Sequence, residues 1–387
     1  MLRNLLLLLA LSGFALANPL LVLSIDGLDH RYLRDADKLG LRIPNIRRLL
    51  REGQWAAQGV VGVVPTVTWP SHTSMISGVP PSVHGILNNK RPKDQGGEYY
   101  WSVDLLKVPT LLDAMRAAGR KSAAITWPVT VNALVDFNLP EYFEGRNGGA
   151  MDLAAIEKKA TPGLIAEITR KYPSFPKQWV DDRGRAQALM FLLAEKKPDL
   201  LLVHFVDLDS EAHENGPFSR EANAILEYTD ELIGDVLRVM PKDYVLALVS
   251  DHGFERTDRH VNLKPLAGDG VTIAPYLATA TTPEAATRLR ELARTKPESG
   301  LGREVPKAEL PAGAVAAWEP AIHLAFGAEP LAKPRGNHGF WPTRTDYRST
   351  FVLWGPGVKQ DRLPEIQMTS LAERFAKVLR LTWPVKR

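Results

Sequence analysis

Short apolar runs typical of buried strands alternate along this chain with segments that have helical spacing. The strand candidates are residues 19–25, 121–126, 198–206, 244–250 and 350–354. Helical patterns lie between them: residues 44–53 end at Gly53, and residues 109–119 begin with a proline and end with a glycine. This alternation predicts an α/β fold in which helices cover both faces of a mostly parallel central sheet.

Two regions interrupt the alternation. Residues 139–197 are helical and loop-rich, and residues 267–336 are rich in proline, alanine, arginine and glycine. We interpret both regions as insertions or a cap within one catalytic domain of residues 18–387, because neither shows a repeat or a separate strand–helix rhythm. The net charge of +4 is small for 387 residues, so no binding of duplex nucleic acid is expected.

The first seventeen residues have the layout of a secretory signal peptide. They carry one cation, Arg3, then an apolar core from Leu5, and the small-residue pattern Ala15-Leu16-Ala17 before Asn18. We expect residues 1–17 to be removed and the protein to be exported to the periplasm or the extracellular space, with an uncleaved anchor as the alternative. The apolar core is too short for a membrane span, and no other segment is long enough, so no transmembrane segment is expected.

Carboxylates and imidazoles follow several of the apolar runs directly. In parallel α/β sheets, ligands bind outside the carboxyl ends of the strands, so these side chains should gather at one edge of the sheet. Each alone has an ordinary explanation as a turn residue or a helix N-cap. Asp209 and His213, four residues apart, would share one face of a helical turn. Together they form one candidate ligand set, which is Asp26, Asp209, His213, Asp251, His252 and His338.

This ligand set predicts a metal centre. Mixed aspartate and histidine ligation suits Zn²⁺, and less well Mn²⁺ or Mg²⁺, and the chain has no cysteine to supply thiolates. The set is too large for one tetrahedral ion and about large enough for two. Two ions about 4 Å apart stabilise the attacking and the leaving oxygen of an in-line displacement at phosphorus. The predicted cofactor is therefore a pair of zinc ions.

The stretch "VPTVTWPSH" at residues 64–72 holds a candidate nucleophile. It places two threonines, Thr66 and Thr68, between a strand-like run and a helix start with Pro70 in its first turn. A threonine there can present its oxygen beside the helix N-terminus, where the N–H groups and the dipole favour an anion. Trp69 beside them is either an aromatic platform for a substrate ring or a hydrophobic wedge.

Six motifs in this order resemble the nucleotide pyrophosphatase/phosphodiesterase branch of the alkaline phosphatase superfamily. They are "SIDG", "PTVTWPSHTSMISG", "HGILNN", "DLDSEAH", "SDHG" and "GNHGF", and they extend from residue 24 to residue 340. The resemblance implies the alkaline-phosphatase-like fold, two zinc ions, and hydrolysis of phosphoric diesters through a phospho-threonine intermediate. It also implies an enzyme whose partner is a small phosphodiester or nucleotide substrate.

The resemblance carries roles to individual positions. It makes Thr68 the nucleophile, and it makes Asn89 the group that helps hold a non-bridging phosphoryl oxygen. One zinc ion would be bound by Asp26, Thr68, Asp251 and His252. The other would be bound by Asp209, His213 and His338.

Some positions depart from the family pattern. Leu208 and Ala212 stand where the family has proline and glycine, Val129 replaces a glycine, and His204 takes the place of an aromatic residue. None of these changes removes a ligand or the nucleophile, but they weaken the expectation that the leaving group is a nucleotide. Among the other histidines, His72 and His84 are expected to be structural. His260 and His323 are the alternative third ligands if His338 does not bind the metal.

Two alternatives stay open at this point. The first is a phosphate monoesterase or a phosphonate hydrolase on the same scaffold, which needs an extra cation near the phosphoryl oxygens, with Lys90 and Arg91 as candidates. The second is a non-catalytic exported protein that keeps the metal centre for stability. A sulfatase is not expected, because the chain lacks both cysteine and the motif that chemistry requires.

Overall fold

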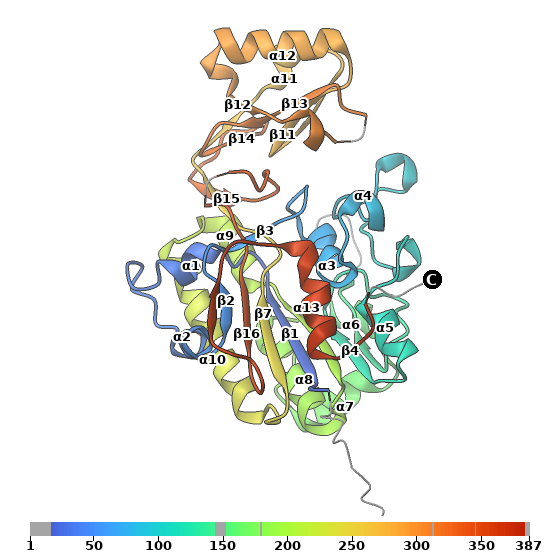
Figure 1. Ribbon diagram of the computed structural model, residues 1–387. Coiled ribbons are helices and arrows are strands. Elements are labelled where there is room, and N and C mark those ends of the chain that lie inside the picture. Colours follow the sequence, from blue (N-terminus) through green and yellow to red (C-terminus); the bar gives the residue numbers. More distant parts are fainter. Residues whose placement is uncertain (1–16, 144–151, 179, 312, 345, 384–387) are drawn as a thin grey trace, which may run out of the picture.

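This computed structural model describes residues 17–143, 152–178, 180–311, 313–344 and 346–383. A sheet of eight strands forms the centre of its larger lobe (Figure 1). Its strand order is β17-β2-β16-β7-β1-β6-β4-β5. The expected signal peptide, residues 1–17, lies outside the described residues except for Ala17.

The sheet is mostly parallel, as predicted. Five neighbouring strands run parallel, namely β7 (Val245–Val249), β1 (Leu20–Ile25), β6 (Leu200–Phe205), β4 (Ser122–Ile125) and β5 (Phe137–Leu139). At the other edge, β16 (Phe351–Trp354) runs antiparallel to β7 and to β2 (Gln54–Ala56), and β17 (Asp361–Leu363) pairs with β2 in parallel. The carboxylates predicted to gather at one edge of the sheet therefore follow strands of the parallel part and not strands of the mixed edge.

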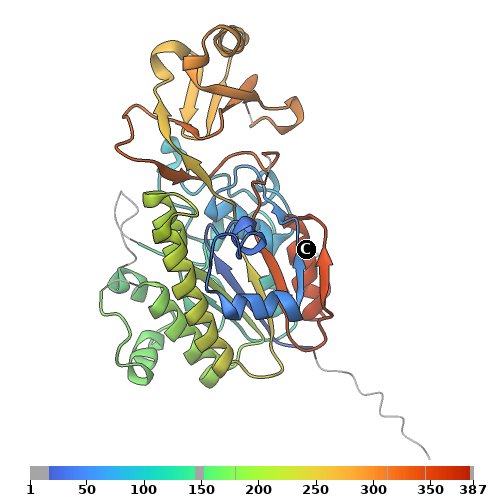
Figure 2. The ribbon, with the colours of Figure 1, turned by 90° about the vertical axis from the view of Figure 1, so that its left-hand side faces the viewer.

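Helices cover both faces of the sheet because its strands are apolar on both sides. On β1, Leu21 and Leu23 pack into one core cluster, while Leu20 and Val22 pack into the other. The first face is covered by α2 (Pro44–Glu52), α6 (Leu153–Glu157), α7 (Leu164–Lys171), α8 (Asp182–Phe191) and α10 (Arg220–Val239). Figure 2 shows α2 and α10 lying over this face. The second face is covered by α3 (Thr68–Ser77), α5 (Leu111–Ala117) and α13 (Leu371–Val378).

Short elements complete the larger lobe. They are α1 (His30–Arg34), α4 (Pro81–His84), α9 (Asp207–Asn215), β3 (Val60–Val61), β18 (Ile366–Gln367), the 3₁₀ turns η1 (Lys93–Gln95), η2 (Val103–Leu105) and η6 (Met368–Ser370), and the π-helical turn η3 (Leu192–Lys196). Two helix starts are informative. The helix expected from residue 109 begins at Leu111, because Thr110 and Asp113 form a capping box there. The helix expected after the threonine pair begins at Thr68 itself.

A smaller lobe stands above the larger one in Figure 1, as a cap with its own apolar core. Its sheet has the order β10-β11-β13-β12 and consists of β10 (Val271–Ala274), β11 (Leu277–Ala280), β13 (Ala316–Pro320) and β12 (Leu301–Glu304). With it lie α11 (Lys264–Ala267), α12 (Pro283–Thr295), η4 (Pro297–Ser299) and η5 (Lys307–Glu309). Two strand pairs connect the lobes, β8 (Glu255–Thr257) with β15 (Arg335–Asn337), and β9 (Arg259–Val261) with β14 (Leu324–Phe326).

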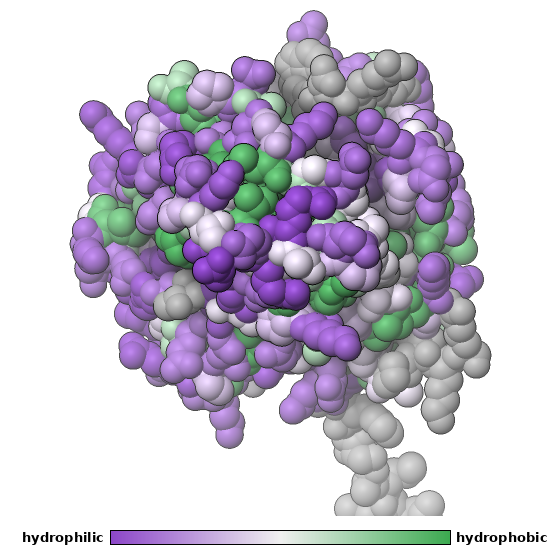
Figure 3. Space-filling model, turned by 90° about the horizontal axis from the view of Figure 1, so that it is seen from above, coloured by the Kyte–Doolittle hydropathy of each residue, from purple (hydrophilic) through white to green (hydrophobic). Residues whose placement is uncertain are grey.

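The surface seen from above the cap is largely hydrophilic with scattered apolar side chains (Figure 3). Within the described part of the chain, every helix is too short or too polar to span a bilayer.

A buried carboxylate joins two elements below the strand ends. Asp182, the first residue of α8, accepts hydrogen bonds from the backbone N–H groups of Val206 and Asp207, at 2.8 and 3.0 Å. Its Oδ1 also lies 2.7 Å from Nη1 of the buried Arg185. Because Asp207 begins α9, this carboxylate positions the helix that carries Asp209.

We predict that Asp182→Ala lowers the free energy of unfolding by about 3 kcal/mol or more, because it removes the charge partner and the acceptor of a buried network. Denaturant unfolding of the wild type and the variant measures this loss. Glu195→Ala is the matched control, because it removes a carboxylate whose ion pair with Lys171 is exposed, and its unfolding midpoint should stay nearly unchanged. Equal midpoints for all three proteins would contradict the assigned role of Asp182.

Candidate metal centre

Three neighbouring strands deliver the candidate carboxylates to one place. β1 lies between β6 and β7 in the sheet. Asp26 follows β1, Asp251 follows β7 two residues beyond its end, and Asp209 lies in the first turn of α9 after β6. The carboxyl ends of adjacent parallel strands meet at one edge, so these carboxylates converge although they are far apart in sequence.

The imidazole of His252 lies in the middle of this cluster. Its Nε2 is 3.1 Å from Asp251 Oδ2, 3.2 Å from Asp26 Oδ1 and 4.0 Å from Asp209 Oδ1. The ring of His338 stacks on it, with centroids 3.6 Å apart. The side chains therefore form two overlapping groups that could each hold an ion, Asp26–Asp251–His252 and Asp209–His252–His338.

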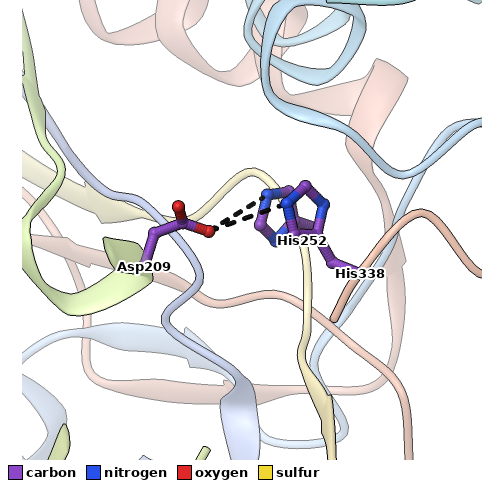
Figure 4. Close-up of side chains that lie close together, drawn as sticks. All are labelled: Asp209, His252 and His338. Atoms are coloured by element: carbon purple, nitrogen blue, oxygen red, sulfur yellow. Dashed lines mark ion pairs between the residues drawn. The ribbon is translucent and has the colours of Figure 1, made fainter. Parts of the chain in front are cut away.

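Asp209 faces two further imidazoles. Its Oδ1 lies 3.7 Å from His338 Nε2 and 3.6 Å from His213 Nε2. Figure 4 shows the carboxylate of Asp209 pointing toward the rings of His252 and His338, which arrive from separate segments. All six candidate ligands expected from the sequence thus lie together. His252 belongs to both groups, whereas it was expected to bind only the first ion.

The three histidines share one orientation. In each, Nδ1 lies within hydrogen-bond distance of a backbone carbonyl: His213 near Gly336 O at 3.2 Å, His252 near Gly253 O at 3.1 Å, and His338 near Thr66 O at 3.1 Å. A carbonyl oxygen only accepts, so Nδ1 carries a proton, and in the neutral ring Nε2 keeps its lone pair. In all three the free Nε2 points at the carboxylates, which is the orientation of metal-ligating histidine.

The cluster also contains buried polar atoms without a hydrogen-bond partner. Asp26 Oδ1, Asp209 Oδ1, Asp251 Oδ2 and His252 Nε2 are buried and unpaired. Such groups cost free energy unless a partner satisfies them, and these four are all ligand atoms facing one another. The residues present therefore fit a bound cation, and oxygen with imidazole nitrogen is a donor set that zinc accepts.

The electrostatics of the cluster lead to the same conclusion. Burial and the neighbouring Asp26 raise the pKa of Asp251 to about 7, and burial together with Asp26 and Asp251 raises the pKa of Asp209 well above its usual range. Although burial opposes it, contact with Asp251 and Asp26 raises the pKa of His252 to about 9. Three carboxylates this close cannot all ionise beside one imidazolium, and a metal ion would supply the further positive charge that they need.

The candidate nucleophile lies on a buried helix end. Thr68 is the first residue of α3 and only 5% exposed. The side chain of Asn89 reaches the same helix end, since its Oδ1 accepts a hydrogen bond from the N–H of Trp69 at 3.0 Å. An anion at this place would meet the positive end of the helix dipole.

The other threonine of the pair has a different task. The hydroxyl of Thr66 donates to Phe340 O at 2.7 Å and lies 2.8 Å from the hydroxyl of Tyr347. Its backbone carbonyl orients His338. Thr66 is thus a supporting residue for a candidate ligand, which the sequence did not indicate because its partners lie more than 270 residues away.

Trp69 packs into an aromatic cluster of the protein itself. Its ring lies 4.8 Å from that of Tyr99 and 5.9 Å from that of Trp101, centroid to centroid, and only 5% of the residue is exposed. Phe143 also packs against Tyr99 and Trp101. This packing favours the wedge interpretation, and the role of Trp69 as a platform for a substrate ring stays a prediction.

The remaining histidines lie as follows. His72 is buried, with Nδ1 2.9 Å from Thr68 O and Nε2 2.8 Å from Ser24 Oγ, so it supports the helix start. His260 and His323 lie on β9 and in the turn before β14, near carbonyls of the connecting segments, and belong to neither ligand group. The sequence did not predict that His204, which is buried, contacts Asp26. The one signal in the sequence was that a histidine stands where the family has an aromatic residue.

The fold and the site together define an α/β protein with a candidate metal centre at the carboxyl ends of its parallel strands. The model of the type I phosphodiesterase/nucleotide pyrophosphatase family matches residues 20–309. The chain therefore belongs to this family.

Similar proteins were found by sequence and by structure. The chain is 24% identical to human ectonucleotide pyrophosphatase/phosphodiesterase family member 1 over 65% of its own length and 25% of that protein. It is also 24% identical to venom phosphodiesterase 2 of Crotalus adamanteus, over 62% of its length and 27% of that protein. It thus spans about a quarter of these relatives. The structure of murine ectonucleotide pyrophosphatase/phosphodiesterase 5, in an inactive threonine-to-alanine form in complex with AMP, superposes with a TM-score of 0.69 at 17% identity and covers 96% of this chain and 97% of that one.

We predict that zinc stabilises the metal-depleted protein, because a ligand that binds only the folded state raises its stability by about 4 kcal/mol at a thousand times its dissociation constant. Thermal unfolding after chelation, with and without added zinc, measures the effect. Asp209→Asn should lose most of the zinc-dependent rise in melting temperature, whereas Asp243→Asn, an exposed carboxylate of the larger lobe, should keep it. The prediction fails if wild type and Asp209→Asn respond equally to zinc.

A second prediction concerns the loop that leads to Asn89. Burial lowers the pKa of His84 to about 4, and its Nδ1 accepts a hydrogen bond from Ile86 N–H that a protonated ring could not accept. Between pH 6.5 and pH 4 the unfolded chain therefore binds a proton at His84 that the folded chain does not, so stability falls as pH falls, by up to about 3 kcal/mol. Denaturant unfolding across this range should show a shallower pH dependence for His84→Gln than for wild type or for the exposed control His323→Gln. Identical slopes would contradict it.

Proposed function

We propose that this protein is a two-zinc phosphodiesterase that hydrolyses small phosphoric diesters through a phospho-threonine intermediate on Thr68. The main support is the convergence of three buried carboxylate oxygens that lack a hydrogen-bond partner with three inward-facing imidazole nitrogens. Membership of the type I phosphodiesterase/nucleotide pyrophosphatase family supports the reaction class. The inactive threonine-to-alanine form of the murine structural neighbour supports a threonine as the reacting group.

The division of the ligands between the two ions is taken from the family resemblance. One ion would take Asp26, Asp251 and His252, which lie together as one group, and the Thr68 oxygen. The other would take Asp209 and His338, which lie together in the second group, and His213, whose Nε2 lies 3.6 Å from Asp209 Oδ1. When bound, zinc supplies Lewis acidity that lowers the pKa of an oxygen ligand and offsets charge at phosphorus.

The chain's own groups account for the remaining requirements. Thr68 Oγ loses its proton and forms a bond to phosphorus while the bond to the leaving alcohol oxygen breaks, and that oxygen gains a proton. The N-terminus of α3 and the side chain of Asn89 would hold the non-bridging phosphoryl oxygens. In the second step the oxygen of water bonds to phosphorus, the bond to Thr68 Oγ breaks, and a proton returns to the threonine.

The substrate class and the location complete the proposal. A small phosphodiester or a nucleotide is the proposed substrate, supported by the AMP bound to the murine neighbour. Hydrolysis outside the cytoplasm is proposed from the signal-like pattern of residues 1–17.

We predict that Thr68→Ala lowers kcat for an aryl phosphodiester by at least a thousandfold, because the attacking oxygen is removed. Zinc content should be unchanged, because Asp26, Asp251 and His252 would still hold the ion. Steady-state kinetics and metal analysis of the same preparations measure both quantities. The matched control is Thr73→Val on the same helix, whose hydroxyl donates to the backbone of Trp69, and it should keep the wild-type kcat within a few fold.

Substantial turnover by Thr68→Ala with zinc bound would exclude the threonine mechanism. The assignment as a diesterase is tested separately, by comparing kcat/KM for an aryl phosphate with kcat/KM for its methyl diester on one preparation. A preference for the diester supports the proposal, and a preference for the monoester makes the protein a phosphomonoesterase.

A further inference from the structure

His204 lies in the protein interior between two carboxylates. It belongs to β6, where it pairs beside Ser24 of β1, and it is fully buried. Its Nε2 lies 3.0 Å from Asp26 Oδ2, and its Nδ1 lies 3.1 Å from Glu141 Oε2. Glu141 is itself only 4% exposed. The three side chains form a continuous line from the segment after β5 to the candidate metal centre.

This line determines which oxygen of Asp26 faces the other ligands. Oδ2 is occupied by His204, whereas Oδ1 lies 3.2 Å from His252 Nε2 and has no hydrogen-bond partner. An unrestrained carboxylate can rotate and exchange its two oxygens. With one oxygen held from behind, the other keeps its direction toward the site.

The backbone beside His204 is strained in a way that keeps the line together. Thr126 has φ of 45°, a left-handed conformation that is costly for a β-branched residue. Its hydroxyl donates to His204 O at 2.8 Å, its carbonyl oxygen lies 3.2 Å from His204 Nδ1, and its N–H donates to Leu139 O. Thr126 thus ties β6 to the segment that leads from β5 into Glu141, and these contacts hold it in the strained conformation.

We propose that His204 and Glu141 are positioning residues that orient Asp26 for metal binding. Buried polar side chains in an apolar sheet cost free energy unless they pair, and this pair is satisfied only when it contacts Asp26. Neither residue is among the candidate ligands, so both act through Asp26. The inference rests on the proposed metal centre and adds the two residues that orient one of its ligands, Asp26.

The test is zinc affinity, measured by competition with a chelator on the full chain. His204→Phe, which fills the space with an apolar ring, and Glu141→Ala should each weaken zinc binding 10- to 100-fold. Glu141→Gln should stay within about threefold of wild type, because its amide oxygen still accepts from Nδ1. The same measurements are repeated with each variant in a His338→Ala background. There the other ligand group has lost a member, so a change in zinc affinity reports on the group that contains Asp26.

Tyr244→Phe is the control for a merely structural role. It removes a buried hydrogen bond to Pro198 O far from the line, so it should lower the melting temperature without changing zinc affinity. If His204→Phe and Glu141→Ala behave like Tyr244→Phe, with wild-type affinity, the positioning role is overturned.

Two further outcomes are decisive. If His204→Phe does not fold, the comparison of Glu141→Ala with Glu141→Gln decides, because only the alanine variant should weaken binding. If the wild type binds no zinc, the proposed metal centre fails, which is a different result from a wild type that binds zinc and variants that bind it equally well.

Discussion

Three carboxyl groups are buried close to one another at the carboxyl ends of the central strands. Asp26, Asp209 and Asp251 all approach the single imidazole of His252, and burial raises the pKa of two of these carboxyl groups. Without added positive charge such a cluster must take up protons. The orientation of His213, His252 and His338, each with Nδ1 turned to a backbone carbonyl, prepares the cluster for a metal ion instead.

The sheet explains why this arrangement can exist. β1 is flanked by β6 and β7, so one aspartate from the end of each strand region arrives at the same edge. The strands are apolar on both faces, and packing of helices on both sides fixes their ends relative to one another. The start of α3 brings Thr68 and the Asn89 amide together at one helix N-terminus.

The surrounding residues hold the site in one geometry. Thr66 orients His338, Asp182 orients the start of α9, and His204 lies behind Asp26. These supports come from loops and strands distant in sequence, and the cap is joined to the same region by β8 and β15, on either side of which the candidate ligands His252 and His338 lie.

The strand–helix alternation, the mostly parallel sheet and the candidate ligands could be predicted from the sequence, because apolar periodicity and the residues after each run are local properties. The position of Thr68 at a helix start could be predicted in the same way. Three features became visible only in the folded chain: His252 belongs to both ligand groups, Thr66 supports His338, and Glu141 and His204 lie behind Asp26. Side-chain orientation depends on contacts between segments tens to hundreds of residues apart, which no local pattern records.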